Sequence, residues 1–372
     1  MPSRRTFVKS LATAAAGLAF PPTLRTNPGL EAALAAGSPD LQAPPRREVT
    51  INGRRVRVVD VHAHCSIPEA AAGRGRGGNQ APGGGQTGAS LVLGPSRLAY
   101  MDAQGIDIQV LSINPSWYGA ARDAAQTICS VQNEQLAAWC AKYPTRFVAL
   151  ASVALQFPEL AATQLEEGVK KLGLRGAAIG GSVEGEELSS PRFDPFWAKA
   201  QELNVPIFMH PQTAQGTTQN NRLQGRGGLG NTIGNPLETT VFLSHLIFEG
   251  TLDRFPGLRI CAAHAGGYLP SYSGRSDALC GRGGGGDCTS LKKKPSEYFR
   301  KELFVDSMIF HEEGLRHLVA EMGSGQIVYG TDYPYDWPVG VDFVLNASFL
   351  SDSERESILG GNAAALFGLN RA

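Results

Sequence analysis

The chain has 372 residues, and its 34 basic and 34 acidic side chains give a formal net charge of zero. This length allows one large domain or two ordinary ones, and a hydrophobic content of 42% is ample for a sizeable core. Nucleic acids are bound by strongly basic surfaces, so the balanced charge argues against a nucleic-acid partner.

The first 45 residues are predicted to be an export signal followed by a linker. Arg4 and Arg5 precede a mildly apolar run, residues 11–20, which is too short to span a bilayer because a span takes about 20 residues. Paired arginines before a short Ala-rich run resemble a twin-arginine export signal, with residues 33–35 as a candidate cleavage site. We therefore expect a periplasmic or secreted protein with no membrane partner; the alternative is a disordered basic tail.

From residue 50 onward, apolar runs typical of strands alternate with helical stretches. The expected helices include residues 121–142, 159–171, 195–203, 237–252 and 312–321. The expected strands are residues 57–62, 106–113, 147–155, 176–179, 205–210, 259–264, 303–306 and 326–329. Eight strands separated by helices indicate a single α/β domain over residues 50–372, a (β/α)8 or TIM barrel. The alternative, an open doubly wound sheet, would carry a Gly-rich phosphate turn after its first strand, where this chain has His62-Ala63-His64.

Histidines stand at the ends of several expected strands. His62 and His64 end the first strand, and residues two apart on a strand point to the same face. His210 ends the fifth strand, His264 ends the sixth, and Asp332 follows the eighth. In a barrel these strand ends converge on one mouth. Imidazole and carboxylate suit zinc or a similar divalent ion, so we expect three histidines to be metal ligands and the fourth to be an acid or base.

These motifs, taken in order, resemble those of the amidohydrolase superfamily. They are Asp60-x-His-x-His, His210 before proline, His264-x-Gly-Gly and Gly-Thr-Asp332-Tyr-Pro. More narrowly, the chain resembles the branch that contains aminocarboxymuconate-semialdehyde decarboxylase and the resorcylate-type decarboxylases, over residues 56–369. The resemblance implies one divalent metal ion, most often zinc and sometimes manganese. The implied ligands are His62, His64, His210 and Asp332.

The same resemblance assigns roles to further side chains. His264 matches the acid/base histidine, and Asp332 is expected to serve catalysis as well as metal binding. Arg275 matches an arginine that binds the carboxylate of a small-molecule substrate, in some members across a homodimer interface, so a homodimer is expected. Asp306 matches a polar position of the seventh strand and, like Asp60, is a candidate for supporting the metal ligands. Asp60 has the parity of the two histidines of its strand, which predicts an inward carboxylate that supports the ligands or is simply buried.

Gly-rich segments interrupt the barrel pattern at three places. Residues 66–98 follow the first strand, where related decarboxylases often place another carboxylate-binding arginine; the candidates are Arg74, Arg76 and Arg97. Residues 212–235 follow the fifth strand and form either a lid over the mouth or a surface insertion. Cys280 and Cys288 flank a third Gly-rich loop and could form a disulfide outside the cytoplasm.

Two reactions fit these residues, and a third interpretation involves no reaction. The leading interpretation is a metal-dependent decarboxylase acting on a small unsaturated or aromatic carboxylic acid. The alternative is a metal-dependent hydrolase of an amide, ester or lactone, which needs only an activated water and a polarised carbonyl. A barrel that binds metal or ligand without catalysis is the third, and the presence of His264 beside every metal position argues against it. The same side chains serve either reaction, so the sequence leaves that choice open.

Overall fold

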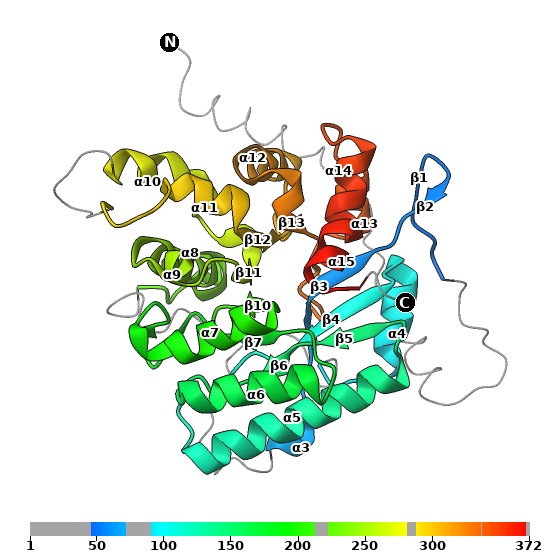
Figure 1. The fold of residues 1–372 in the computed structure, drawn as a ribbon. Helices are drawn as coiled ribbons and strands as arrows, with labels where there is room; N and C mark the ends of the chain where they lie inside the picture. The colour runs from blue at the N-terminus through cyan, green and yellow to red at the C-terminus, as the bar shows by residue number, and fades with distance from the viewer. Residues whose placement is uncertain (1–45, 72–90, 213–221, 281–287, 336, 370–372) are drawn as a thin grey trace, which may run out of the picture. The chain divides into compact units, whose positions relative to one another are not determined.

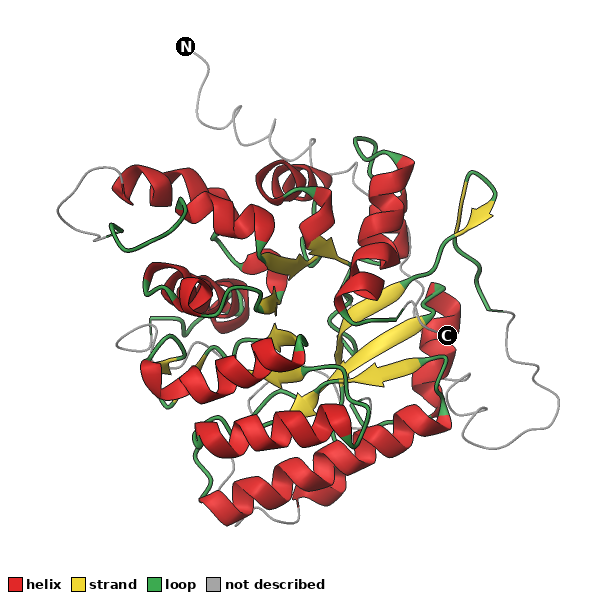
Figure 2. Cartoon of the chain, in the orientation of Figure 1, coloured by secondary structure: helices red, strands yellow, loops and turns green. Residues whose placement is uncertain are grey.

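A computed structural model describes residues 46–71, 91–212, 222–280, 288–335 and 337–369. Strands lie at the centre of this part of the chain and helices surround them (Figure 1, Figure 2). The expected export signal lies outside the described residues, as do Arg74 and Arg76.

Parallel strands form the wall of the barrel. They are β3 (Val59–His64), β4 (Ile108–Ser112), β5 (Phe147–Ala149), β6 (Ala151–Ser152), β7 (Ala177–Ile179), β10 (Pro206–Met209), β11 (Arg259–Ala262), β12 (Leu303–Asp306) and β13 (Ile327–Val328). Two sheets result, one in the order β3-β4-β5 and the other in the order β13-β12-β11-β10-β7-β6. Each neighbouring pair is parallel, as crossover helices require.

Main-chain hydrogen bonds join the two sheets into a closed barrel. Leu150, the residue between β5 and β6, donates to the carbonyl of Leu111 in β4 at 2.9 Å, so β5 and β6 are two segments of one barrel strand. On the other side, Val61 of β3 donates to the carbonyl of Tyr329, just after β13, at 2.9 Å. The predicted TIM barrel is therefore confirmed, and the predicted strand 147–155 corresponds to this divided strand.

Helices pack around the strands. They are α3 (Pro68–Ala71), α4 (Pro95–Gln104), α5 (Arg122–Lys142), α6 (Pro158–Lys170), α7 (Asp194–Leu203), α8 (Asn235–Phe248), α9 (Thr251–Arg254), α10 (Ser273–Cys280), α11 (Pro295–Lys301), α12 (Glu312–Met322), α13 (Val341–Leu345), α14 (Asp352–Glu356) and α15 (Asn362–Leu366). In α12, for example, the buried residues Leu315, Leu318 and Met322 recur at helical spacing and form one apolar stripe. The predicted helix over 237–252 is divided, because Gly250 adopts a left-handed conformation (φ 72°) between α8 and α9.

Two short antiparallel hairpins were not expected from the sequence. They are formed by β1 (Thr50–Ile51) with β2 (Arg54–Arg55) and by β8 (Ser182–Val183) with β9 (Glu186–Glu187). Strands of two residues are too short to show an alternating pattern. The first turn did carry a signal, since Asn52-Gly53 is a preferred hairpin dipeptide and both residues have positive φ.

Apolar side chains fill the space between the strands. Val61, Val110, Phe208 and Val328 belong to one buried cluster that also contains residues of α15. The strands therefore enclose a packed core rather than a pore. Within the described residues, none of the helices has the length and apolar character that a bilayer span would need.

Candidate metal centre

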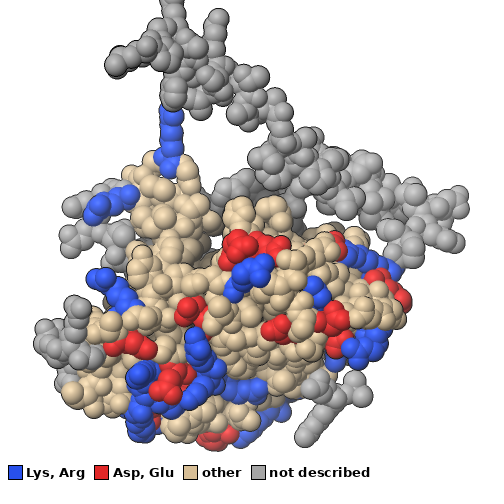
Figure 3. All heavy atoms as spheres, turned by 90° about the horizontal axis from the view of Figure 1, so that it is seen from above, with Lys and Arg blue, Asp and Glu red and all other residues tan. Residues whose placement is uncertain are grey.

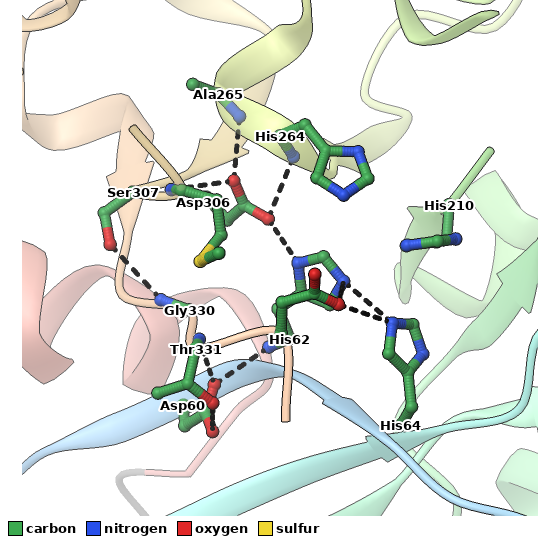
Figure 4. Close-up of polar contacts among 12 residues, drawn as sticks. Asp60, His62, His64, His210, His264, Ala265, Asp306, Ser307, Gly330 and Thr331 are labelled. Atoms are coloured by element: carbon green, nitrogen blue, oxygen red, sulfur yellow. Dashed lines mark hydrogen bonds and ion pairs between the residues drawn. The ribbon is translucent and has the colours of Figure 1, made fainter. Parts of the chain in front are cut away.

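Four side chains from three strand ends converge in one buried group. His62 and His64 belong to β3, His210 follows β10, and Asp332 follows β13. Their potential ligand atoms all lie within 4.8 Å of one another, and the four residues are only 0 to 7% exposed. Figure 4 shows the three imidazole rings gathered on one side of the β3 ribbon. The structure thus brings together the four residues that the resemblance implies as ligands.

Three of the ligand atoms form a tight triangle. Nε2 of His62 lies 3.0 Å from Nε2 of His64 and 3.1 Å from Oδ1 of Asp332, and the remaining side, from His64 to Asp332, is 2.9 Å. A divalent ion bound at about 2.0–2.2 Å from nitrogen and oxygen ligands would hold them at about this separation. One proton, by contrast, cannot satisfy two ring nitrogens and a carboxylate oxygen together. The donor set therefore fits a single divalent ion.

In His62 and His210, a hydrogen bond at Nδ1 directs the other ring nitrogen, Nε2, toward the centre of the ligand set. Nδ1 of His62 lies 2.7 Å from Oδ2 of Asp306, and Nδ1 of His210 donates to the carbonyl of Pro211 at 2.8 Å. Such carboxylate–imidazole and carbonyl–imidazole pairs fix the orientation of metal-binding histidines. Nδ1 of His64 is buried and has no partner among the described residues.

Asp306 also holds the main chain that carries His264. Its carboxylate accepts hydrogen bonds from the N–H groups of His264 at 3.1 Å and of Ala265 at 2.8 Å. Both residues have left-handed φ values, 56° and 54°, which are strained for residues other than glycine. Asp306, expected as a polar residue of the seventh strand that could support the ligand set, therefore orients the ring of His62 and stabilises the turn at His264.

Burial and opposite charges perturb the ionisation of the group. Burial alone would lower the pKa of His62, but the carboxylates of Asp332 and Asp306 raise it to about 10. Burial lowers the pKa of both His64 and His210, so these rings are neutral and ready to bind a cation. Burial opposes ionisation of Asp332, yet the charge on His62 holds the pKa of that carboxyl well below its usual value.

His264 lies against the ligand set without joining it. The centroid of its ring lies 5.3 Å from that of His62 and 5.0 Å from that of His210, and its buried Nδ1 has no partner among the described residues. Burial, together with the charge on His62, lowers the pKa of His264 to about 4. The ring is therefore neutral at neutral pH and can accept a proton.

Trp337 is a site residue that the sequence analysis missed. Its indole Nε1 donates to Oδ2 of Asp332 at 2.8 Å, which leaves Oδ1 facing the histidines. The ring also packs against Phe310, with centroids 5.2 Å apart, and the ring of Tyr335 lies 6.1 Å from that of His64. The available signal was the aromatic run directly after the Gly-Thr-Asp332-Tyr-Pro motif.

Neither of the two predicted arginines that the structure describes contributes an atom to the ligand set. Arg275 is exposed on α10 and makes no hydrogen bond or ion pair recorded among the described residues. Arg97 is fully buried and bonds to the main chain at His64, so it is not free to bind a substrate carboxylate. Asp60 is buried as expected, but a register irregularity in β3 between Asp60 and Ala63 means that parity alone does not define its direction.

The predicted pairing of Cys280 with Cys288 is present as a disulfide, with Cα atoms 5.2 Å apart. It joins the end of α10 to the residues that precede α11. The segment 212–235, predicted to be either a lid or a surface insertion, falls partly outside the described residues, which resume at Arg222. At its start, the N–H of Gln212 donates to the buried carboxylate of Glu238 at 3.0 Å.

Comparisons with known proteins identify relatives over most of the chain. A family model described as Amidohydrolase matches residues 59–369. The chain is 31% identical over 282 residues to 2-amino-3-carboxymuconate-6-semialdehyde decarboxylase of Dictyostelium discoideum, covering 74% of this chain and 76% of that protein. It is 32% identical over 289 residues to gamma-resorcylate decarboxylase of Rhodococcus jostii, covering 74% and 87% respectively.

Solved structures with the same fold include two decarboxylases. A 2,6-dihydroxybenzoate decarboxylase from Rhizobium gives a TM-score of 0.74 at 28% identity, covering 85% of this chain and 99% of that chain. A dihydroxybenzoic acid decarboxylase from a Polaromonas species, solved with bound manganese and the inhibitor 2-nitroresorcinol, gives a TM-score of 0.73 at 28% identity, covering 85% and 98%. These relatives share a decarboxylase activity, and one of them holds a metal ion.

We predict that the affinity of the site for Mn²⁺ rises with pH between about pH 6 and 8. Below a pKa of about 10 His62 holds a proton, and an ion that binds its Nε2 must displace that proton. Release of one proton increases affinity by about tenfold per pH unit. His264, with a pKa of about 4, contributes nothing in this range. Calorimetric titration with Mn²⁺ at three pH values measures the slope.

The matched control is His245→Ala, which removes a histidine of α8 that is bonded to Glu249 and lies outside the ligand set. This variant should show the slope of the unaltered protein. An Mn²⁺ affinity that is independent of pH would contradict the assignment of a displaced proton to His62.

Proposed function

Because this chain belongs to the amidohydrolase family, we propose that it is a metal-dependent decarboxylase of a small aromatic or unsaturated carboxylic acid. One observation carries the proposal. A buried set of three histidines and one aspartate lies against a neutral fourth histidine, His264, in a chain whose relatives decarboxylate such acids. The remaining parts of the barrel supply the rigid strand ends on which this arrangement depends.

The metal is a divalent ion held by His62, His64, His210 and Asp332. Nitrogen and oxygen donors in this ratio suit zinc, the ion expected from the resemblance, and manganese, the ion bound in the Polaromonas structure. When bound, the ion would polarise an oxygen of the substrate and stabilise the negative charge that develops as carbon dioxide leaves. Metal analysis of protein purified without added metal tests which ion is taken.

His264 moves the proton in the proposed reaction. Loss of carbon dioxide leaves the electron pair of the broken carbon–carbon bond on the substrate, and that carbon must then be protonated. A neutral imidazole beside the ligand set can accept a proton from a substrate hydroxyl or from solvent and deliver it to this carbon. The hydrogen bonds from the main chain of His264 and Ala265 to Asp306 keep the ring in place during both transfers.

A second copy of the chain completes the substrate site in this proposal. Tyr272 and Leu279 are 58% and 53% exposed, and with Arg275 they follow one face of the helical segment 270–280. Two large apolar side chains that flank an arginine suit burial against a partner surface. Through such a contact Arg275 would reach the mouth of the partner's barrel and bind the substrate carboxylate, a role for which its planar guanidinium is suited.

We predict that the metal-loaded protein releases carbon dioxide from hydroxylated benzoic acids, among them 2,6-dihydroxybenzoate. His264→Ala should lower kcat by about 10²- to 10⁴-fold, the usual contribution of a positioned acid or base, while the metal content stays the same. His317→Ala, which removes an exposed histidine bonded to Ser271, is the control and should keep full activity. Carbon dioxide release and ring opening of a lactone panel are measured side by side.

Three outcomes would contradict parts of this assignment. Full turnover by metal-loaded His264→Ala would remove the proton-transfer role of that residue. Hydrolysis of a lactone, ester or amide without release of carbon dioxide from any acid would favour the hydrolase alternative. Turnover that survives complete removal of metal by a chelator would exclude the metal-dependent reaction altogether.

We predict that Leu279→Asp converts a dimer into monomers, because it replaces a large apolar side chain of the proposed interface with a charged one. The variant should lose activity through a higher KM, and Arg275→Lys should raise KM without changing the oligomeric state. Analytical ultracentrifugation and steady-state kinetics measure these effects. A fully active monomer at low concentration would contradict a contribution of Arg275 across the interface.

We also propose that the protein is exported by the twin-arginine route. The support is the paired Arg4 and Arg5 before an Ala-rich run, together with a disulfide, which persists in oxidising compartments. Expression of the full chain in a bacterial host should yield a shortened protein in the periplasmic fraction, and Arg4→Lys with Arg5→Lys should retain it in the cytosol. Uncleaved cytosolic protein from the unaltered chain would contradict export.

A further inference from the structure

A fully buried arginine lies directly behind the metal-binding strand. Arg97, in the first turns of α4, is 0% exposed. One terminal nitrogen of its guanidinium donates to the main-chain carbonyl of His64, and the other donates to Oε1 of Gln109 at 3.2 Å. Its flat face lies over the ring of Tyr333, 4.1 Å from the ring centroid. Among the described residues, no carboxylate forms a direct ion pair with it.

Gln109 connects this cation to a buried anion. Its side-chain Nε2 donates to Oδ2 of Asp60 at 2.9 Å, while its Oε1 accepts from Arg97. The amide is thus oriented by a positive charge at its oxygen and a negative charge at its nitrogen. Asp60, Gln109 and Arg97 are each 0% exposed, so water does not screen these contacts.

Asp60 fixes two further segments of main chain. Oδ1 accepts from the N–H of His62 at 3.1 Å and from the N–H of Thr331 at 3.0 Å, and Oδ2 accepts from the hydroxyl of Thr331 at 2.7 Å. Figure 4 shows Asp60 between the β3 ribbon and Thr331. Thr331 immediately precedes Asp332. The carboxylate of Asp60 therefore links β3, which carries His62 and His64, to the turn that carries Asp332.

We propose that Arg97 is a positioning residue for metal binding, acting through Gln109 and Asp60. At one end of this chain of contacts, Arg97 holds the main chain of His64 and the ring of Tyr333. At the other end, Asp60 holds the main chain of His62 and Thr331. The hydrogen bonds of Arg97 and Asp60 therefore hold the main chain of both β3 histidines and of the turn that carries Asp332. By fixing these segments, they set the spacing of about 3 Å between the ligand atoms of His62, His64 and Asp332.

Only arginine can make all three of these contacts. Its planar fork reaches two acceptors in fixed directions while its face stacks on an aromatic ring, whereas lysine offers a single ammonium with neither property. A buried cation is also a weak source of stability, because removing its hydration costs about as much as its partners return. The contacts that Arg97 makes with the segments of His64 and of Asp332 are therefore explained by a role in positioning the metal ligands and not by a contribution to stability.

The test compares Arg97→Met and Arg97→Lys with Met101→Ala, a matched control. Met101 is 0% exposed and lies one turn further along α4, and the hydrogen bonds that join Arg97, Gln109, Asp60 and His64 do not involve its side chain. Arg97→Met should weaken Mn²⁺ affinity by about 10- to 100-fold, the usual effect of losing support to metal ligands, and Arg97→Lys should recover only part of it. Met101→Ala should lower thermal stability but change Mn²⁺ affinity less than about twofold.

The readouts are calorimetric titration with Mn²⁺ alone and the electron paramagnetic resonance spectrum of the bound ion. The inference rests on the metal site of the proposed function, but neither readout needs a substrate. A negative result here would therefore not decide whether the protein is a decarboxylase or a hydrolase, and a wrong assignment of the reaction would not affect this test. If Arg97→Met does not fold, Gln109→Met breaks the same chain of contacts with both charges retained, and it should also weaken Mn²⁺ binding. If the folded variants keep the Mn²⁺ affinity and the spectrum of the unaltered protein, the proposal is overturned.

Discussion

Closure of the barrel between its first and last strands is the constraint on which the metal centre depends. The N–H of His64 donates to the carbonyl of Tyr333 at 2.8 Å, and Val61 donates to Tyr329 at 2.9 Å. These bonds set the turn that carries Asp332 beside the two histidines of β3, although some 270 positions of sequence separate them. An opening of this seam would separate the ligand atoms of the two β3 histidines from that of Asp332.

The site stores strain and buried charge, and the surrounding hydrogen bonds hold both in place. His264, Ala265 and Asp332 all adopt left-handed φ values between 54° and 56°, a conformation that residues with side chains adopt at a cost. Asp306 stabilises two of them by accepting hydrogen bonds from their N–H groups. Figure 3 shows basic and acidic side chains interspersed on the face seen from above.

The strands and the ligand residues could be predicted from the sequence because both leave local marks. A buried parallel strand is a short apolar run, and a histidine or aspartate where such a run ends is conspicuous. The contacts of Arg97 leave no such mark, since their partners lie on other elements and follow no periodicity. The partner of Trp337 lies only five residues away, so its signal was local, but an aromatic residue after a motif does not by itself indicate a hydrogen bond to Asp332. Asp60 is buried, as the sequence predicts, and it bonds to the main chain of His62 and Thr331, although β3 is irregular between Asp60 and Ala63. The proposed role of Arg275 involves a second copy of the chain, and the sequence of one chain carries no direct information about such a contact.

X-ray absorption spectroscopy of the manganese-loaded protein tests most directly whether three imidazoles and one carboxylate hold a single divalent ion. We expect one ion per chain, bound directly by three ring nitrogens and by an oxygen of Asp332 at about 2.0–2.2 Å. His210→Ala should remove one of those nitrogens and leave the others in place. Two ions per chain, or a metal environment that His210→Ala leaves unchanged, would contradict this ligand set.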